Sequence, residues 1–154
     1  MHRMEFKIDE KPVFRIREGK NIKDYKKTLK FPRSQDSFYG FNDRGANGNY
    51  LLLFATLDNN SIAGVCFAEF YSKNLLWLRQ IFVMDKHRRR GIGTALVKKF
   101  ISCAETKGAY NILCDSKASD KSTRKFLKKI GFRKVGKIKR HFGQKDYYLW
   151  EYVL

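Results

Sequence analysis

The chain has 154 residues, enough for one domain, and its 43% hydrophobic and 15% aromatic content can fill one sizeable core. No apolar run approaches the roughly 18 residues of a membrane helix, and the N-terminal stretch lacks the features of a secretory signal, so we expect a soluble, cytoplasmic protein. The net charge of +18 favours an anionic partner, such as RNA or an acidic protein, or else a Lys-rich solvated surface.

The first third of the chain has few clear patterns. Residues 13–16 could form a short strand, and Asn21 is a suitable N-cap for a helix through Lys30, which the Phe31-Pro32 step would end. Residues 40–49 are dense in turn-forming residues and predict an exposed loop.

The pattern sharpens from Tyr50 onward. Strand-like runs cover residues 50–57 and 62–71, joined by a hairpin connection at residues 58–61, and a third strand is predicted over residues 75–83. Three consecutive strands with short connections predict an antiparallel meander.

Apolar residues then recur at helical spacing between Gly91 and Gly108, and a short strand follows at residues 110–114. A second helix is expected from a cap near Ser119 or Asp120 to Ile130, before strands over residues 132–142 and 146–153. The order ββββαβαββ, with one or two early helices, predicts an α+β sheet whose antiparallel arms flank a parallel centre.

Three cysteines lie in unrelated apolar stretches, without CxxC spacing or a nearby pair of histidines: Cys66, Cys103 and Cys114. This pattern indicates neither a disulfide framework nor a zinc site. We expect buried free thiols that behave as small hydrophobic groups, and no bound metal.

The most informative segment is residues 83–96, in which a strand leads through a basic loop into an amphipathic helix. The free N–H groups and partial positive charge of a helix N-terminus attract anions. Gly91 and Gly93 lack a Cβ that would keep the backbone away from a pyrophosphate, and the arginines before them add charge. The segment therefore predicts a phosphate site, the simpler alternative being a solvated basic turn.

Two other nucleotide-binding motifs fit less well. The P-loop pattern GxxxxGK[ST] does not occur in the chain. A dinucleotide fingerprint is disfavoured because Leu96 replaces its third small residue, a loop separates the strand from the glycines, and the preceding strands form hairpins.

The run Arg88-Arg-Arg-Gly-Ile-Gly93 resembles the acetyl-coenzyme A loop of the GNAT acetyltransferase superfamily, (Gln/Arg)-x-x-Gly-x-(Gly/Ala). Residues 120–132 are similar to its second signature, an Asn-led helix that ends in a hydrophobic residue, Gly and Phe. The resemblance covers roughly residues 50–154. It implies a GNAT fold with about four flanking helices, in a single domain of residues 1–154 with a variable acceptor-side segment (1–49) and a cofactor-binding core (50–154).

This resemblance also implies roles for individual residues. The backbone of Ile81, Phe82 and Val83 would contact the pantetheine arm of acetyl-coenzyme A, which would enter a splay between this strand and the strand of residues 110–114. Asp120 falls where relatives often have an Asn that contacts the cofactor. The pyrophosphate would be held by Arg88, Arg89, Arg90, Gly91, Ile92, Gly93 and Thr94.

The implied reaction is acetyl transfer to a primary amine by direct attack in a ternary complex. The amine must be neutral, so a base is useful. Asp115 resembles the position of a glutamate base in the branch that acetylates ribosomal-protein N-termini, and Glu69 is a second candidate because it interrupts an apolar strand. Each could equally be a surface carboxylate or a partner for one of the many cations.

Many relatives use a tyrosine, four residues before the second-signature Gly, to protonate the departing thiolate. Here that position is Leu127, and solvent or Tyr110, Tyr147 or Tyr148 could replace the tyrosine. The alternative function is a coenzyme A-binding regulatory module or a nucleic-acid-binding module with little turnover. The basic run at residues 133–141 fits that alternative, although no RRM-type motif is present. A monomer or a homodimer is expected.

Overall fold

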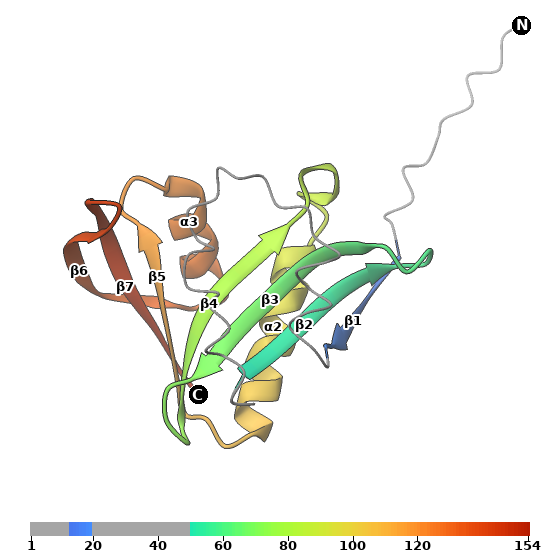
Figure 1. Cartoon of the computed structure of the whole chain (residues 1–154), viewed down its shortest axis with the longest axis horizontal. Coiled ribbons are helices and arrows are strands. Elements are labelled where there is room, and N and C mark those ends of the chain that lie inside the picture. Colours follow the sequence, from blue (N-terminus) through green and yellow to red (C-terminus); the bar gives the residue numbers. More distant parts are fainter. Residues whose placement is uncertain (1–12, 20–49) are drawn as a thin grey trace, which may run out of the picture.

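The computed structural model describes residues 13–19 and 50–154. In these residues seven strands form one sheet in the order β1-β2-β3-β4-β5-β7-β6, accompanied by two α-helices and a 3₁₀ turn (Figure 1). The elements are β1 (Phe14–Glu18), β2 (Tyr50–Leu57), β3 (Ile62–Phe70), β4 (Leu75–Val83), η3 (Asp85–His87), α2 (Ile92–Thr106), β5 (Asn111–Lys117), α3 (Lys121–Ile130), β6 (Arg133–Phe142) and β7 (Lys145–Val153).

The predicted order ββββαβαββ and the mixed sheet are confirmed. Strands β1 to β4 pair antiparallel, β4 and β5 pair parallel, and β5, β7 and β6 pair antiparallel. The described part of the chain contains two α-helices, which is fewer than the expected four or so. The helix expected over residues 21–30 and the loop expected over residues 40–49 lie outside the described residues.

Strands β2 and β3 are buried on both faces, which is why each reads as a continuous apolar run rather than an alternating one. One face of the sheet packs against α2 and α3 through residues such as Leu53, Leu76 and Trp150. The other face carries a second apolar cluster that includes Leu52, Phe67 and Phe82. Strands β2, β3 and β4 each contribute residues to both clusters.

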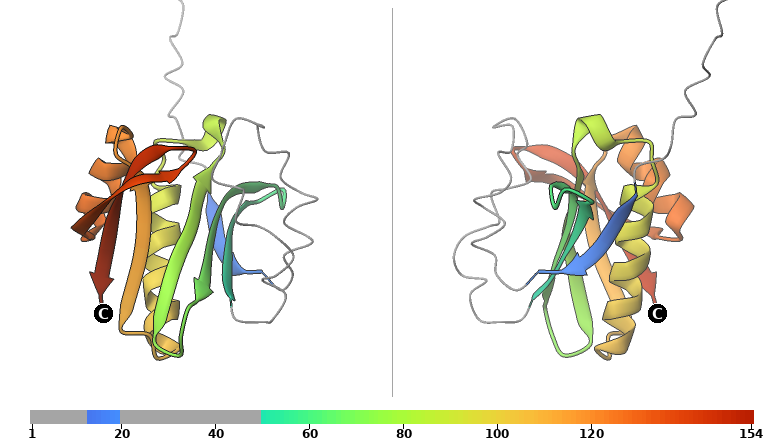
Figure 2. Two further views of the ribbon diagram at one scale, coloured as in Figure 1. Left: turned by 60° about the vertical axis from the view of Figure 1, so that its left-hand side comes forward. Right: turned by 90° about the vertical axis from the view of Figure 1, so that its right-hand side faces the viewer.

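Helix α2 lies across one face of the sheet against β1 to β4 (Figure 2). Its inward residues Leu96, Val97, Phe100 and Ala104 are fully buried, as the three- and four-residue spacing predicts. Gly64 in β3 permits this close packing. A Cβ added there would lie 2.9 Å from the backbone oxygen of Phe82 and 3.1 Å from the Leu96 side chain.

Two of the three free cysteines are buried as expected. Burial raises the pKa of Cys66 and of Cys114, so both thiols stay protonated, while Cys103 is half-buried. Within residues 13–19 and 50–154 there is no cluster of three potential metal ligands among His, Cys, Asp and Glu. No helix in those ranges has the length and apolar character needed to cross a membrane.

Replacing Gly64 by Ala should destabilise the fold by about 1–3 kcal/mol, because the new methyl group meets a backbone oxygen that cannot move without disturbing β4. Gly136→Ala in β6 is the matched control, since its Cβ would have its nearest neighbour, the Leu149 side chain, at an ordinary 3.9 Å. Chemical denaturation of both variants measures the difference. Equal stability of the two would contradict the close packing of β3, β4 and α2.

Candidate functional site

Strands β4 and β5 run side by side for three rungs and then separate. The ladder joins Leu75 to Asn111, Leu76 to Ile112 and Trp77 to Leu113, and beyond that point the two strands diverge (Figure 1). Residues 78–83 remain paired with β3, and residues 114–117 remain paired with β7. The separation is therefore held from both outer sides, as the expected splay requires.

Strand β4 also carries a bulge near the point of separation. Phe67 of β3 faces Gln80 and the next residue, Ala68, faces Leu78, so Arg79 is an extra residue in β4. A bulge re-aims the side chains that follow it. Accordingly, Leu78 before the bulge and Ile81 after it both pack in the cluster against the helices, although they are three residues apart.

At the end of β4 the chain turns through η3 and enters α2. Arg89 and Gly91 have positive φ angles of 62° and 81°. Gly91 is the N-cap of α2 and provides no side-chain cap, and a Cβ added to it would meet nothing within 4 Å. The first N–H groups of the helix have no intrahelical acceptors, and Gly91 has no side chain to cap them.

The three arginines of this loop differ in their surroundings. Arg88 donates from Nε to the backbone oxygen of Val83 at 3.0 Å and lies 3.0 Å from the Asp85 carboxylate. Arg89 and Arg90 are exposed, and neither has an ion-pair partner within the described residues. The loop therefore holds two uncompensated cations beside an uncapped helix N-terminus, an arrangement that suits a phosphate group.

The remaining first-turn residues contribute through their backbone. Ile92 is buried in the core, and Thr94 is half-buried. A Cβ at Gly93 would lie 3.6 Å from Phe126 and from Val83, which is ordinary contact. Gly93 thus differs from Gly91, because neither its φ angle nor its protein neighbours require a glycine.

Asp120 is the N-cap of α3, one of the two caps that the sequence predicted. Its Oδ1 accepts from the backbone N–H of Thr123 at 3.0 Å and its Oδ2 from the Thr123 hydroxyl at 2.6 Å. Both carboxylate oxygens therefore serve the helix start.

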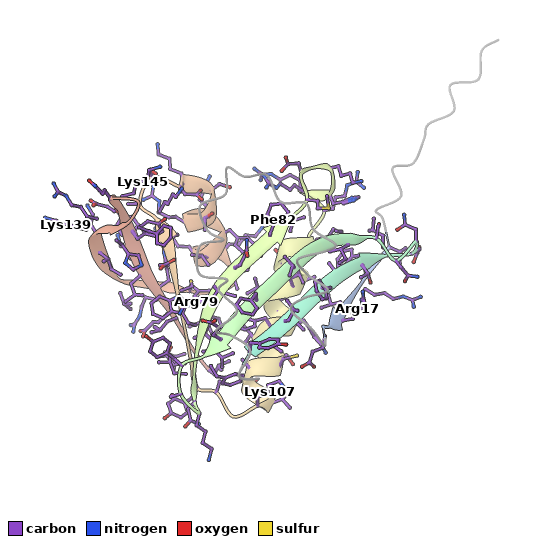
Figure 3. The ribbon with its side chains drawn as sticks, viewed as in Figure 1. Arg17, Arg79, Phe82, Lys107, Lys139 and Lys145 are labelled. Atoms are coloured by element: carbon purple, nitrogen blue, oxygen red, sulfur yellow. The ribbon has the colours of Figure 1, made fainter. Side chains whose placement is uncertain are left out.

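The two candidate bases have different partners. Asp115 lies on β5 beyond the separation, and its Oδ2 is 3.1 Å from Nε2 of His141 in β6. Glu69 of β3 pairs with Trp77, the last residue of β4 that also pairs with β5. Its Oε2 accepts a hydrogen bond from Nε of Arg79 at 2.8 Å. Arg79, labelled in Figure 3, also stacks 5.0 Å from the centre of the Trp77 ring.

His141 is a partner of Asp115 that the sequence patterns did not predict. The two residues are 26 positions apart, and their contact depends on how β6 pairs with β7, where the register shifts twice. His141 also packs edge-on against Tyr147, with ring centres 5.3 Å apart. The sequence hint was its place at the end of the strand before β7, the strand that pairs with β5.

The position of the usual tyrosine is filled by a core residue, since Leu127 is 3% exposed. Of the possible replacements, Tyr110 precedes β5 at the end where β4 and β5 are paired. Tyr147 and Tyr148 lie opposite Lys117 and Ser116, beyond the separation. The structure thus brings two of the three tyrosines to the diverging end of the sheet.

The sequence profile of the Acetyltransferase (GNAT) family matches residues 19–132, more than half of the chain. The chain belongs to the GNAT acetyltransferase family. No curated protein matches it significantly by sequence. As a GNAT protein it is an acyltransferase by family, and the predicted fold class is confirmed.

Solved GNAT structures share this fold at low sequence identity. The ribosomal-protein-S18-alanine N-acetyltransferase of Escherichia coli aligns with a TM-score of 0.74 and 18% identity over 92% of this chain and 94% of its own. Ard1 of Thermoplasma volcanium aligns at 0.72 and 19%, over 92% and 97%. A GNAT acetyltransferase of Elizabethkingia anophelis with acetyl-CoA bound aligns at 0.71 and 21%, over 92% and 98%.

We expect His87 in η3 to make the stability of the loop between β4 and α2 depend on pH. Among the residues that the structure describes, its buried Nδ1 has no hydrogen-bond partner, and burial, followed by the charges of Lys86 and Arg90, lowers the pKa of His87. Because the folded state resists protonation, the stabilising contribution of neutral His87 is complete above its unfolded pKa of about 6.5 and is lost as the pH falls below that value.

We expect the melting temperature of the wild-type chain to fall more between about pH 7 and pH 5 than that of His87→Gln, which cannot be protonated there. Differential scanning calorimetry across this range measures both proteins. The same pH dependence in the two would show that His87 does not carry the effect.

Proposed function

We propose that this GNAT protein transfers the acetyl group of acetyl-CoA to a primary amine by direct attack in a ternary complex, and that it does so in the cytoplasm. The observation that carries the proposal is the uncapped N-terminus of α2 beside the separated strands β4 and β5. The acetyl-CoA bound to the Elizabethkingia relative supports the choice of cofactor. The alanine N-acetylation in the name of the Escherichia coli relative supports an amine acceptor.

The residues present fit a phosphorylated cofactor with an amide-bearing arm. Arg89, Arg90 and the first N–H groups of α2 would bind the pyrophosphate, with Gly91 leaving the approach open. Backbone groups at residues 81–83 would bind the pantetheine arm, because β5 no longer pairs with β4 there. Asp120 would act indirectly by fixing the start of α3.

In the proposed reaction the neutral amine nitrogen attacks the acetyl carbonyl carbon. A C–N bond forms, the C–S bond breaks, and the sulfur leaves with the electron pair as a thiolate. The nitrogen then gives up a proton, which a base accepts, and the thiolate takes a proton from a tyrosine or from solvent. Tyr147 and Tyr148 are the nearest candidates by strand position for that second proton.

Asp115 and His141 are together the best-supported base. A carboxylate that bonds one imidazole nitrogen orients the ring and leaves the other nitrogen to exchange a proton, for which histidine is suited near neutral pH. Glu69 is the weaker candidate, because its Oε2 already accepts from Arg79. The proposal therefore assigns Asp115 to orientation and His141 to proton transfer.

Replacing Asp115 by Asn or His141 by Gln should lower kcat by about 10² to 10⁴-fold, the usual contribution of a general base. The double variant should lose little more than either single variant, because the two side chains act as one unit. Glu69→Gln is the matched carboxylate control and should cost less than about tenfold, roughly the loss of one exposed ion pair. Steady-state release of coenzyme A with an amine panel measures all four proteins.

A larger loss of kcat in Glu69→Gln than in Asp115→Asn would indicate that the base is Glu69 of β3. An unchanged rate after replacing both carboxylates would exclude each as the base. Calorimetric titration with acetyl-CoA should give the same affinity for all of these variants, which separates catalysis from cofactor binding.

Gly91→Ala tests the cofactor site against a control of equal strain. Gly91 and Gly108 have φ angles of 81° and 84°, and a Cβ on either would meet nothing within 4 Å. Both Ala variants should lose about 1–2 kcal/mol of stability from the left-handed backbone. Only Gly91→Ala should also weaken acetyl-CoA binding, by about tenfold or more in calorimetric titration, since its methyl group points to the open side of the α2 N-terminus.

The burial of Leu127 favours one alternative, a coenzyme A-binding module with little turnover. That function predicts tight acetyl-CoA binding, loss of binding in Gly91→Ala, and no coenzyme A release with small amines, peptides or RNA-linked amines. Acceptor-dependent release with any of these classes would exclude it.

A further inference from the structure

The excess positive charge is concentrated in one part of the fold. From Lys121 to Lys145 every formally charged side chain is Lys or Arg, with no Asp or Glu in between. This stretch contains α3, β6 and the β6–β7 turn. In α3 the pairs Lys121 and Lys125, Arg124 and Lys128, and Lys125 and Lys129 each place like charges four residues apart, which is unfavourable in a helix.

The charged sides of α3 and β6 meet at Tyr148. The guanidinium of Arg124 in α3 lies 5.5 Å from the centre of the Tyr148 ring, and Nζ of Lys134 in β6 lies 4.4 Å from it. Lys139 and Lys145 lie at the outer end of the β6–β7 hairpin (Figure 3). Helix and strand thus carry cationic side chains on either side of Tyr148, and we call the cationic residues of α3, β6 and the β6–β7 turn the α3–β6 surface.

Little negative charge offsets this surface. Glu151 pairs with Arg133, and Asp146 lies 3.2 Å from Lys137, so both acids of β7 are already engaged. Lys125, Lys139 and Lys145 are exposed and have no ion pair within the described part of the chain. Most of β6 is exposed along its length, and β6 is the edge strand of the sheet that the described residues form.

We propose that the α3–β6 surface binds the phosphate backbone of a nucleic acid. Protein interfaces are depleted of Lys at their centres, whereas nucleic-acid interfaces are strongly positive and polar. The α3–β6 surface matches the second type, since its exposed large apolar residues are Val135 and Phe142 among many cations. A strand of this length extends about 30 Å, enough to follow several successive phosphates.

The surface is distinct from the loop proposed to bind acetyl-CoA. That loop follows β4 in the middle of the sheet, whereas β6 forms the edge beyond β5 and β7. The two sites approach each other at α3, where Phe126 lies 3.6 Å from the position of a Cβ at Gly93. Its link to the proposed active site is His141, which belongs to β6 and contacts Asp115. A nucleic acid at the β6 end of this surface would adjoin the proposed base pair of Asp115 and His141.

The test compares two triple variants of the full chain with the same change in charge. Lys125→Gln/Lys139→Gln/Lys145→Gln alters the surface, and Lys73→Gln/Lys98→Gln/Lys99→Gln alters exposed lysines elsewhere. Fluorescence anisotropy with labelled RNA and DNA duplexes of about 20 base pairs, and with single-stranded RNA, gives the dissociation constant between about 50 and 200 mM salt.

The surface variant should bind at least about tenfold more weakly than wild type, and its log–log salt slope should fall by about 0.9 for each phosphate that the protein no longer neutralises. The control variant should keep a wild-type slope. Equal affinity for RNA and DNA duplexes would indicate recognition of the backbone charge, and a preference for RNA would indicate recognition of its 2′-hydroxyl groups or shape. Either result supports the proposal.

Equal losses in the two triple variants would overturn it, because binding would then follow net charge alone. Displacement of the nucleic acid by acetyl-CoA would also overturn it by assigning the binding to the cofactor loop. Tighter binding of a polyglutamate peptide than of any nucleic acid would assign the surface to an acidic protein. Failure of acetyl transfer in the enzyme assays would leave each of these binding results unaffected.

Discussion

The separation of β4 and β5 is the constraint on which the rest of the structure depends. Two parallel strands that part in the middle of a sheet leave backbone N–H and C=O groups without their usual partners, which is costly unless something else bonds to them. The cost is limited because β3 and β7 hold the diverging segments from outside. An amide-bearing ligand between the strands could complete the interrupted pairing, as an added strand does at a sheet edge.

The helix that follows β4 is aligned with this separation by close packing. Gly64 lets Ile92 and Leu96 approach the backbone of β3 and β4, so the N-terminus of α2 is held where β4 ends. Gly91 then begins the helix without a side-chain cap. The position of the proposed phosphate site therefore follows from one glycine in the core and one at the helix start, two positions far apart in the sequence.

Local sequence patterns predicted most of the helices and strands of residues 50–154, because each pattern has a local cause. The period of apolar residues, the glycine that ends each helix and the Asp120 cap all act within a few residues. Strand β5 proved longer than predicted, because its last residues are stabilised by distant ones, including the buried bond from the Trp150 indole to the Ser116 hydroxyl at 2.9 Å. The pairing of Asp115 with His141 escaped prediction for the same reason, since it depends on strand register.

The distribution of charge separates structural from functional roles for the basic residues. The acids of the sheet each have a nearby basic partner, as Glu69 has Arg79 and Asp146 has Lys137. These basic residues therefore have a structural role as ion-pair partners. Lys128 and Lys129 also suit the C-terminal turn of α3, but Lys121 at its first turn opposes the helix dipole. Folding alone gives no reason to place unpaired cations there, and self-repulsion makes such a surface slightly unfavourable. A polyanion bound across α3 and β6 would make the electrostatic free energy of this surface favourable, because counterions released from its phosphates favour the complex.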